Sequence, residues 1–210
     1  MTRRPFRRQS GDERRAALVA ATIECIAEHG MHGASVREIA AQAGVSNGLI
    51  RHYFADKDSM VREAYRATME EMTVMAREAA TASSGSPRER LRLFVVANLT
   101  PPVLDAKRLT LWAGFIGIVH QDDRMAAIHD EAYAGFRAEV EQMVREVFAE
   151  AGRTGDAARS AIKINALIDG LWLEGSLAPD LFADSSLGEM GVESVEAILD
   201  LPLSQPAKRT

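Results

Sequence analysis

Apolar side chains recur along this chain three and four residues apart, the spacing of one face of an α-helix. Two series of this kind consist of Trp112, Phe115, Ile116 and Val119, and of Phe136, Val140, Met143 and Val147. No stretch shows a convincing strand-like alternation of apolar and polar residues. The pattern therefore predicts an all-α protein.

Residues that favour helix starts and helix ends divide the first third of the chain into four helices. Serine or aspartate stands at each start and glycine at two of the ends; these residues are Ser10, Gly30, Ser35, Gly44, Ser46 and Asp56. Glu13 and Glu38 complete two capping-box motifs. The predicted helices cover residues 11–30, 36–44, 47–54 and 57 to about 82.

Five further helices are expected after a serine-rich break at residues 81–87. They cover approximately residues 87–99, 105–119, 122–151, 156–177 and 190–200. Gly188 and Gly191 weaken the last of them. These elements suggest two domains: residues 1–55, with a basic N-terminal arm and three short helices, and residues 56–210, a bundle of longer helices.

Charge is distributed unevenly along the chain. Residues 1–57 contain nine Lys and Arg against six Asp and Glu, a net charge of +3, whereas residues 58–210 have a net charge of −8. A basic end on an acidic body suggests that the N-terminal part binds nucleic acid and that the rest has another task.

Two further features bear on the environment of the protein. The longest apolar run, residues 111–119, is much shorter than the roughly 20 residues of a membrane-spanning helix. Cys25 is the only cysteine, which excludes an internal disulfide and every zinc site with two or more thiolates. We therefore expect a cytoplasmic protein with no membrane partner.

Residues 35–57 have the pattern of a helix-turn-helix. Gly44 is expected to form the turn, because glycine adopts positive φ without strain. The residues expected to face the core are Ile39, Ala40, Phe54 and either Leu49 or Ile50. Such a pair of helices can place the second one in the major groove of DNA. The alternative is a generic helical hairpin, which the capping motifs, the basic arm and the charge asymmetry disfavour.

The stretch 18–65 resembles the DNA-binding domain of the tetracycline-repressor (TetR) family. The matching residues are Gly30, Ile39, Ala40, Ala43, Gly44, Val45, Ser46, His52, Tyr53, Phe54 and Lys57. The resemblance implies an all-helical, homodimeric transcription regulator whose C-terminal body binds a small effector. Family members often carry a phosphate-contacting tyrosine two residues before the position of Tyr53. Arg51 stands there in this chain, and the sequence leaves open whether it contacts a base or a phosphate.

A second resemblance extends into the C-terminal part. Residues 30–32, 50–54, 111–113, 120–121 and 167–173 resemble the choline-sensing repressors of glycine-betaine synthesis genes. This implies a repressor that binds an inverted-repeat DNA operator and is released by a small-molecule effector, choline or another cationic amine. The alternatives are an effector-independent structural DNA-binding protein, and a regulator of an efflux or catabolic gene with an apolar effector.

DNA contacts are assigned to the N-terminal part. Asn47 and Arg51 are expected to read bases, or phosphate in the case of Arg51. Lys57 begins the next helix, whose first N–H groups favour phosphate. The complete expected set is Arg3, Arg4, Arg7, Arg8, Ser35, Arg37, Ser46, Asn47, Gly48, Arg51, His52, Tyr53 and Lys57.

The effector is expected to bind inside the C-terminal bundle, because helical bundles commonly hold ligands between their helices. Asp169 lies in a largely apolar helix and needs a partner. It is either a structural hydrogen-bonding group or the counter-charge of a cation, which Trp faces bind well. The expected set is Phe94, Asn98, Trp112, Phe115, Ile116, Tyr133, Phe136, Asp169 and Trp172, with plain core packing as the alternative. Met69, Met72 and Met75 are interpreted as core.

Two apolar stripes near the C-terminus are candidates for a dimer interface. They consist of Ile164, Leu167, Ile168 and Leu171 in the helix at 156–177, and of Val192, Val195, Ile198 and Leu199 in the helix at 190–200. Gly170 and Gly175 would permit close approach. The resemblance implies that these helices form a four-helix homodimer interface, and packing within one chain is the alternative.

Nothing in the sequence predicts an enzyme. The five histidines do not have the spacing that would bring three or four zinc ligands together. No phosphate loop, nucleophile elbow or dinucleotide-binding fingerprint is present. We therefore expect no catalytic residues, no bound metal and no cofactor.

Overall fold

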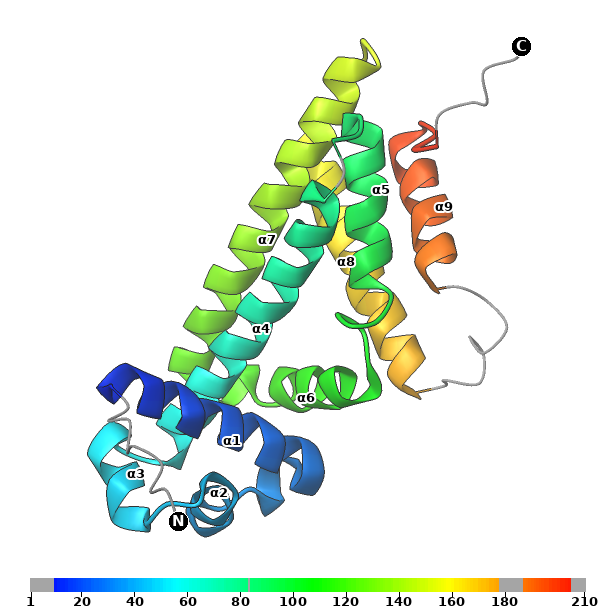
Figure 1. Ribbon diagram of the computed structural model, residues 1–210. Helices are drawn as coiled ribbons and strands as arrows, with labels where there is room; N and C mark the ends of the chain where they lie inside the picture. The colour runs from blue at the N-terminus through cyan, green and yellow to red at the C-terminus, as the bar shows by residue number, and fades with distance from the viewer. Residues whose placement is uncertain (1–9, 83, 178–186, 205–210) are drawn as a thin grey trace, which may run out of the picture. The chain divides into compact units, whose positions relative to one another are not determined.

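The computed structural model describes residues 10–82, 84–177 and 187–204. These residues form nine α-helices and one short 3₁₀ helix, with no strand among them, which confirms the predicted all-α class (Figure 1). None of these helices is both long and apolar enough to cross a lipid bilayer. The chain divides into two compact units, Met1–Ala67 and Thr68–Thr210. The division falls inside α4 (Lys57–Thr81), further along than residue 55, where the sequence suggested it.

The first unit contains α1 (Gly11–Gly33), α2 (Val36–Ala43), α3 (Asn47–Tyr53) and the start of α4. Its helix starts follow the sequence signals: Ser10 and Glu13 cap α1 reciprocally. At Gly30, the predicted helix end, α1 has a φ of 70° and kinks before one more turn. Glycine adopts this left-handed conformation without the steric cost that other residues bear.

The core of this unit is built from the apolar faces of its helices. Its buried side chains include Leu18, Ile26, Ile39, Ile50, Phe54, Met60 and Tyr65. Arg15 of α1 forms an ion pair with Glu63 of α4, with the guanidinium 2.8 Å from the carboxylate. The same guanidinium lies 5.0 Å from the centre of the Phe54 ring. The hydrogen bond from Arg15 holds the pKa of Glu63 below its usual range.

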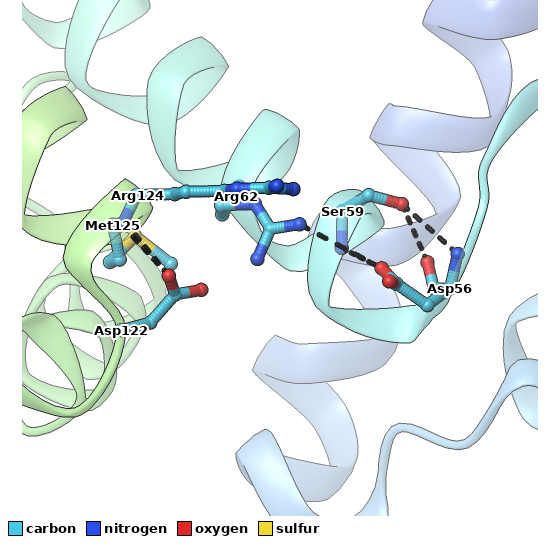
Figure 2. A network of polar contacts seen from close by, with 6 residues as sticks. All are labelled: Asp56, Ser59, Arg62, Asp122, Arg124 and Met125. Atoms are coloured by element: carbon cyan, nitrogen blue, oxygen red, sulfur yellow. Dashed lines mark hydrogen bonds and ion pairs between the residues drawn. The ribbon is translucent and has the colours of Figure 1, made fainter.

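Two long helices begin at aspartate caps. In the first unit, the Ser59 N–H donates to Asp56 Oδ1 over 2.7 Å, and the Arg62 guanidinium lies 3.8 Å from the same carboxylate (Figure 2). In the second unit, Asp122 accepts hydrogen bonds from the first N–H groups of α7 (Asp123–Glu150) (Figure 2). Both caps satisfy N–H groups that a helix start leaves without an intrahelical partner.

The second unit contains the rest of α4, α5 (Pro87–Asn98), α6 (Ala106–Ile116), η1 (Val119–Gln121), α7, α8 (Ala157–Leu177) and α9 (Leu187–Leu199). Helix α7 packs against α5 and α8, and α9 packs against α5 and α8. The single helix predicted over residues 105–119 ends at Ile116 and is followed by the 3₁₀ turn. Gly114 and Gly117 lower the helix propensity at this point.

Much of the apolar surface of α8 and α9 packs inside the unit. Ile164, Ile168 and Val195, which the sequence offered as interface residues, are at most 2% exposed. Within the single chain a Cβ at Gly170 would meet nothing within 4 Å, whereas a Cβ at Gly175 would lie 3.5 Å from Leu187 Cδ1. The predicted close approach between two copies at these glycines stays a prediction. A Cβ at Gly191 would lie 2.1 Å from Leu99 Cδ1, so the glycine that was expected to weaken α9 instead lets α9 pack closely on α5.

Candidate DNA-binding surface and effector cavity

The turn between α2 and α3 has the backbone conformation that the sequence predicted. Gly44 adopts φ 64° and ψ 34°, in the left-handed region. The Val45 N–H donates to the Ala40 carbonyl oxygen over 2.9 Å. Ser46 then caps α3 by accepting a hydrogen bond from the Leu49 N–H. These bonds fix the angle between the two helices, as a helix-turn-helix requires.

Helix α3 has an anchored side and an accessible side. Ile50 is 2% exposed and Phe54, which follows the helix, is 4% exposed, so Ile50 rather than Leu49 is the buried anchor. The exposed residues of α3 are Asn47, Gly48, Arg51 and His52, all of them predicted DNA-binding residues. Their accessibility at the start and outer side of α3 is compatible with contacts to bases and phosphates.

Lys57 makes a contact that the sequence did not indicate. Its ammonium donates to the Met31 carbonyl oxygen over 2.9 Å and joins the start of α4 to the end of α1. An ammonium has three N–H donors, so this bond does not exhaust its capacity for phosphate. Nearby, the His52 and Tyr53 rings meet edge to face with centroids 5.0 Å apart, which holds the half-buried Tyr53 ring beside the exposed His52.

The remaining predicted DNA contacts lie at the start of α2 and before α1. The Ser35 hydroxyl accepts a hydrogen bond from the Glu38 N–H and so caps α2. Arg37 is exposed, with its guanidinium 3.3 Å from the Glu38 carboxylate. Arg3, Arg4, Arg7 and Arg8 lie outside the described residues.

A cavity of about 20 Å³ lies within the second unit. Its walls come from α4, α7 and α8, and the lining residues are Met69, Tyr133, Phe136, Asn165, Ile168, Asp169 and Trp172. Tyr133, Phe136, Asp169 and Trp172 were predicted from the sequence. The volume accommodates about one water molecule, so a larger ligand requires the walls to move.

Three lining residues were not predicted. Asn165 stands four residues before Asp169, on the same helix face, and this spacing is the signal that could have identified it. Met69 and Ile168 were assigned to a core face and to the dimer stripe. Methionine or isoleucine at helical spacing fits a core and a cavity wall equally well, so the sequence offers no signal for them.

Hydrogen-bond donors converge on the Asp169 carboxylate from two sides. Trp112 Nε1 donates to the Tyr133 hydroxyl oxygen over 3.2 Å, and the Tyr133 hydroxyl donates to Asp169 Oδ1 over 3.2 Å. On the other side, Asn165 Nδ2 donates to Asp169 Oδ2 over 2.9 Å. Within the described part of the chain Asp169 forms no ion pair.

Burial dominates the electrostatics of this site. It raises the pKa of Asp169 to about 6, although the hydrogen bonds from Tyr133 and Asn165 and the charge of Arg137 act in the opposite direction. Burial also lowers the pKa of His129, whose ring centroid lies 4.1 Å from that of Tyr133. A carboxyl group that titrates close to neutrality is therefore built into the wall of the cavity.

Both tryptophans belong to the site, one of them in the cavity wall and one behind it. The Trp112 and Trp172 rings meet edge to face, with centroids 5.5 Å apart and an interplanar angle of 87°. Trp172 Nε1 donates to the Asn98 carbonyl oxygen over 2.7 Å. Asn98 thus contributes its backbone carbonyl oxygen, which orients Trp172. Trp112 contributes a hydrogen bond that orients the Tyr133 hydroxyl.

The other predicted effector residues stand further from the cavity. Phe94 is buried and contacts Phe136, with ring centroids 5.4 Å apart. Phe115 is fully buried and Ile116 half-buried, and neither lines the cavity. Their helical spacing correctly marked an inward face, but facing inward is not sufficient to reach the cavity.

No cluster of three or more His, Cys, Asp or Glu side chains that could hold a metal ion lies among the residues that the structure describes. Cys25 is buried, and burial raises the pKa of its thiol. A raised pKa keeps the thiol protonated and unreactive at neutral pH.

The two parts of the chain match two sequence families. Residues 18–64 match the family described as bacterial regulatory proteins, tetR family. Residues 87–200 match the family described as BetI-type transcriptional repressor, C-terminal. Among curated relatives, the HTH-type transcriptional regulator BetI of Burkholderia thailandensis is 29% identical over 186 residues, which cover 89% of this chain and 93% of that protein.

Solved structures agree with this assignment. A transcriptional regulator from Pseudomonas aeruginosa PAO1 has a TM-score of 0.79 at 38% identity, over 92% of this chain and 91% of that chain. A transcriptional regulator from Saccharomonospora viridis in complex with choline has a TM-score of 0.73 at 21% identity, over 90% and 96% of the two chains. The matched families and relatives are transcriptional regulators and not enzymes, and regulators of this kind bind DNA and dimerise. The chain therefore belongs to the TetR family of transcriptional repressors, in the branch with a BetI-type C-terminal domain.

Proposed function

We propose that this repressor binds an inverted-repeat operator as a homodimer and that a small cation, choline in the first instance, releases it. The observation that carries the effector assignment is Asp169, a largely buried carboxylate at the wall of a cavity that Tyr133, Phe136 and Trp172 also line. Asp169 has no ion pair within the described chain. A bound cation would supply the missing counter-charge and would contact aromatic rings, which attract ammonium groups.

The bonding around the cavity favours a quaternary ammonium ion over a primary amine. Tyr133 and Asn165 already donate to the two oxygens of Asp169, and Trp172 Nε1 is bonded to the Asn98 backbone. A primary ammonium brings three N–H donors that need acceptors, whereas a methylated ammonium binds by charge and contact alone. The choline bound to the Saccharomonospora viridis regulator is of this class, and the net charge of −8 on residues 58–210 also favours a cation.

Entry of choline would have to enlarge the cavity. Met69 is the most adaptable wall residue, because its side chain is unbranched and has three rotatable bonds. It belongs to α4, which begins at Lys57 in the DNA-binding unit and ends at Thr81 in the second unit. In this proposal, displacement of Met69 moves α4, and α4 passes the change to the DNA-binding unit. The effector must bind the DNA-incompetent state more tightly, because equal affinity for both states shifts nothing.

The dimer is proposed to form through α8 and α9. The most exposed apolar side chains of α8 are Ile162, Leu173 and Leu177, at 59%, 45% and 72%. Their sequence separations place them on one face of the helix. Two such faces related by a two-fold axis would cover each other and bury this surface in both copies. We expect the recognition helices of the dimer to lie about 34–36 Å apart, one turn of DNA.

A mobility shift on the DNA upstream of the protein's own gene tests this proposal. We expect sequence-specific binding that millimolar choline weakens by a factor of about 5 to 150. The Asp169→Asn variant keeps the shape of the site and should bind the operator but ignore choline. Release by an apolar compound and not by choline would favour an apolar effector. Equal affinity for operator and random DNA would favour a structural DNA-binding protein.

Replacing Asn47 by alanine is expected to weaken operator binding by about 1–3 kcal/mol. Asn47 is the first residue of α3 and is exposed, a position from which side chains reach base edges. Only one base position of each half-site should lose its preference. Binding isotherms on operators that carry each base in turn measure this, and equal weakening on operator and random DNA would contradict a base-reading role.

Lys57→Ala tests a predicted phosphate contact, in contrast to the base contact that Asn47→Ala removes. It is expected to weaken operator and random DNA alike and to reduce the salt dependence of log affinity by about one unit of slope per half-site. Because Lys57 also bonds the Met31 carbonyl oxygen, thermal melting should accompany the assay to check that the unit stays folded. A base-selective effect would refute the phosphate role.

A further inference from the structure

The two hydrogen-bond partners of Asp169 differ in how they can respond to a proton. The Tyr133 hydroxyl accepts a hydrogen bond from Trp112 Nε1 and therefore directs its own hydrogen to Asp169 Oδ1. In this arrangement Tyr133 stabilises the carboxylate more than the carboxylic acid, whose Oδ1 can still accept this hydrogen bond when the proton is on Oδ2. The Asn165 amide can present either its NH₂ or its oxygen to Asp169 Oδ2, by a half-turn about its last side-chain bond. Asn165 can therefore serve both protonation states.

The surroundings of Asp169 contain few other charges. The residues around the site from α4, α5, α6 and α8 are uncharged; they are Met69, Phe94, Asn98, Trp112, Asn165, Ile168 and Trp172. On α7, the charge of Arg137 lowers the pKa of Asp169, and His129 stacks on Tyr133. The pKa of His129 is raised by the charge of Asp130 and lowered by that of His120 in η1. Burial outweighs these charges and leaves the pKa of Asp169 at about 6.

We infer that, in mildly acidic solution, Asp169 holds a proton while the cavity is empty and releases it when the cationic effector enters, so that the response of the repressor to its effector is coupled to pH. The inference rests on the proposed function, because it takes the effector to be a cation. Under these acidic conditions one proton leaves for solvent as one cation binds, and the site avoids an unpaired buried charge in both states. The Asn165 amide presents its oxygen to the protonated group and its NH₂ to the carboxylate.

Competition between proton and cation sets the expected size of the effect. With half-protonation at about pH 6, the apparent dissociation constant for choline should be about ten-fold higher at pH 5 than at pH 8. Titration calorimetry in buffers of different ionisation enthalpy should show release of nearly one proton per choline at pH 5 and almost none at pH 8. Circular dichroism at each pH checks that the protein stays folded.

Three controls assign the proton to Asp169. The uncharged isostere of choline, 3,3-dimethyl-1-butanol, should release no proton and should not lose affinity at pH 5. His129→Gln removes the neighbouring titrating ring and should keep the proton release. Tyr133→Phe removes a donor that favours the carboxylate and should move the midpoint to higher pH.

A titration without any ligand tests the first half of the inference directly. Trp112 and Trp172 are the only tryptophans, and Trp112 is one hydrogen bond away from Tyr133. Intrinsic fluorescence of the full chain should therefore change near pH 6, and this transition should be absent in Asp169→Asn. A transition that persists in Asp169→Asn would overturn the inference.

The possible failures can be told apart. Choline binding that is equally tight at pH 5 and pH 8, with no proton released, would overturn the coupling and leave the proposed function intact. Loss of proton release in His129→Gln would assign the proton to His129 and also overturn the coupling. Failure of choline to bind at either pH would instead overturn the proposed effector, and the fluorescence titration would still decide whether Asp169 is protonated in the empty cavity.

Discussion

Replacing Leu173 by aspartate is expected to give a monomeric protein that no longer binds its operator specifically. Leu173 is 45% exposed on α8, on the same face as Ile162 and Leu177. In a two-fold dimer the substitution occurs twice and places two unpaired carboxylates in an apolar interface, which is costly. A monomer engages only one half-site, and loss of the second binding unit lowers the apparent affinity by a factor of about 10² to 10⁴.

Light scattering reports the oligomeric state of this variant, and a mobility shift reports its affinity for DNA. Val74→Asp is the matched control, because Val74 is an apolar side chain that is 37% exposed on α4, outside the proposed interface. It should remain a dimer and bind the operator. Dimers that persist in Leu173→Asp would show that the interface lies elsewhere.

The Asp169→Asn variant is expected to be more stable than the wild-type protein at pH 7.5, by about 1–2 kcal/mol, and to show no such gain at pH 4. The pKa of Asp169 is raised from its ordinary value of 3.8 to about 6 because the carboxylate is desolvated. The folded chain therefore binds this proton more tightly than the unfolded chain. Wild-type stability falls as pH rises from 3.8 to 6 and stays lower above it, whereas asparagine has no charge to desolvate.

The size of this gain follows from the shift in pKa. One pKa unit corresponds to about 1.4 kcal/mol, so the full penalty would be about 3 kcal/mol. Partial solvent access reduces it. In the variant, the Asn165 amide must also turn to bond the new side chain, or lose its hydrogen bond at a cost of about 1 kcal/mol.

Urea unfolding at pH 4.0, 5.5 and 7.5 measures this difference. Asp130→Asn, which neutralises an exposed carboxylate on α7, should show no comparable pH-dependent gain. If Asp169→Asn were instead less stable than the wild-type protein at pH 7.5, the carboxylate would be a net stabilising hydrogen-bonding group and not a desolvated counter-charge.

The sequence by itself determined most of the DNA-binding unit, because the signals there are local. Serine caps at positions 10, 35 and 46 and the left-handed glycine at position 44 specify where helices start and turn, and they act on backbone groups within a few residues. The exposed positions of α3 follow once its buried anchor is known. The choice between Leu49 and Ile50 required the structure, since both are apolar and adjacent.

Only the tertiary structure decided which inward residues form the effector cavity. Helical spacing marks an inward face, but whether a side chain on it meets core or cavity depends on helices far away in the sequence. Tyr133 and Asp169 line the cavity, whereas Phe115 does not, and Met69 of α4 completes the wall. Asp169 could be singled out as a polar residue in an apolar helix and Asn165 by its spacing of four residues, but the hydrogen bond from Tyr133 on another helix could not.

Contacts with helices far away in the sequence also decide which face of α8 is buried and which is exposed. Both faces carry apolar side chains at helical spacing, so the sequence marks an apolar helix without saying which side a partner covers. Ile164 and Ile168 are buried because other helices of the same unit pack over them, while Ile162 and Leu173 are left outside. That division follows from how α6, α7 and α9 pack around α8, which no periodicity within α8 encodes.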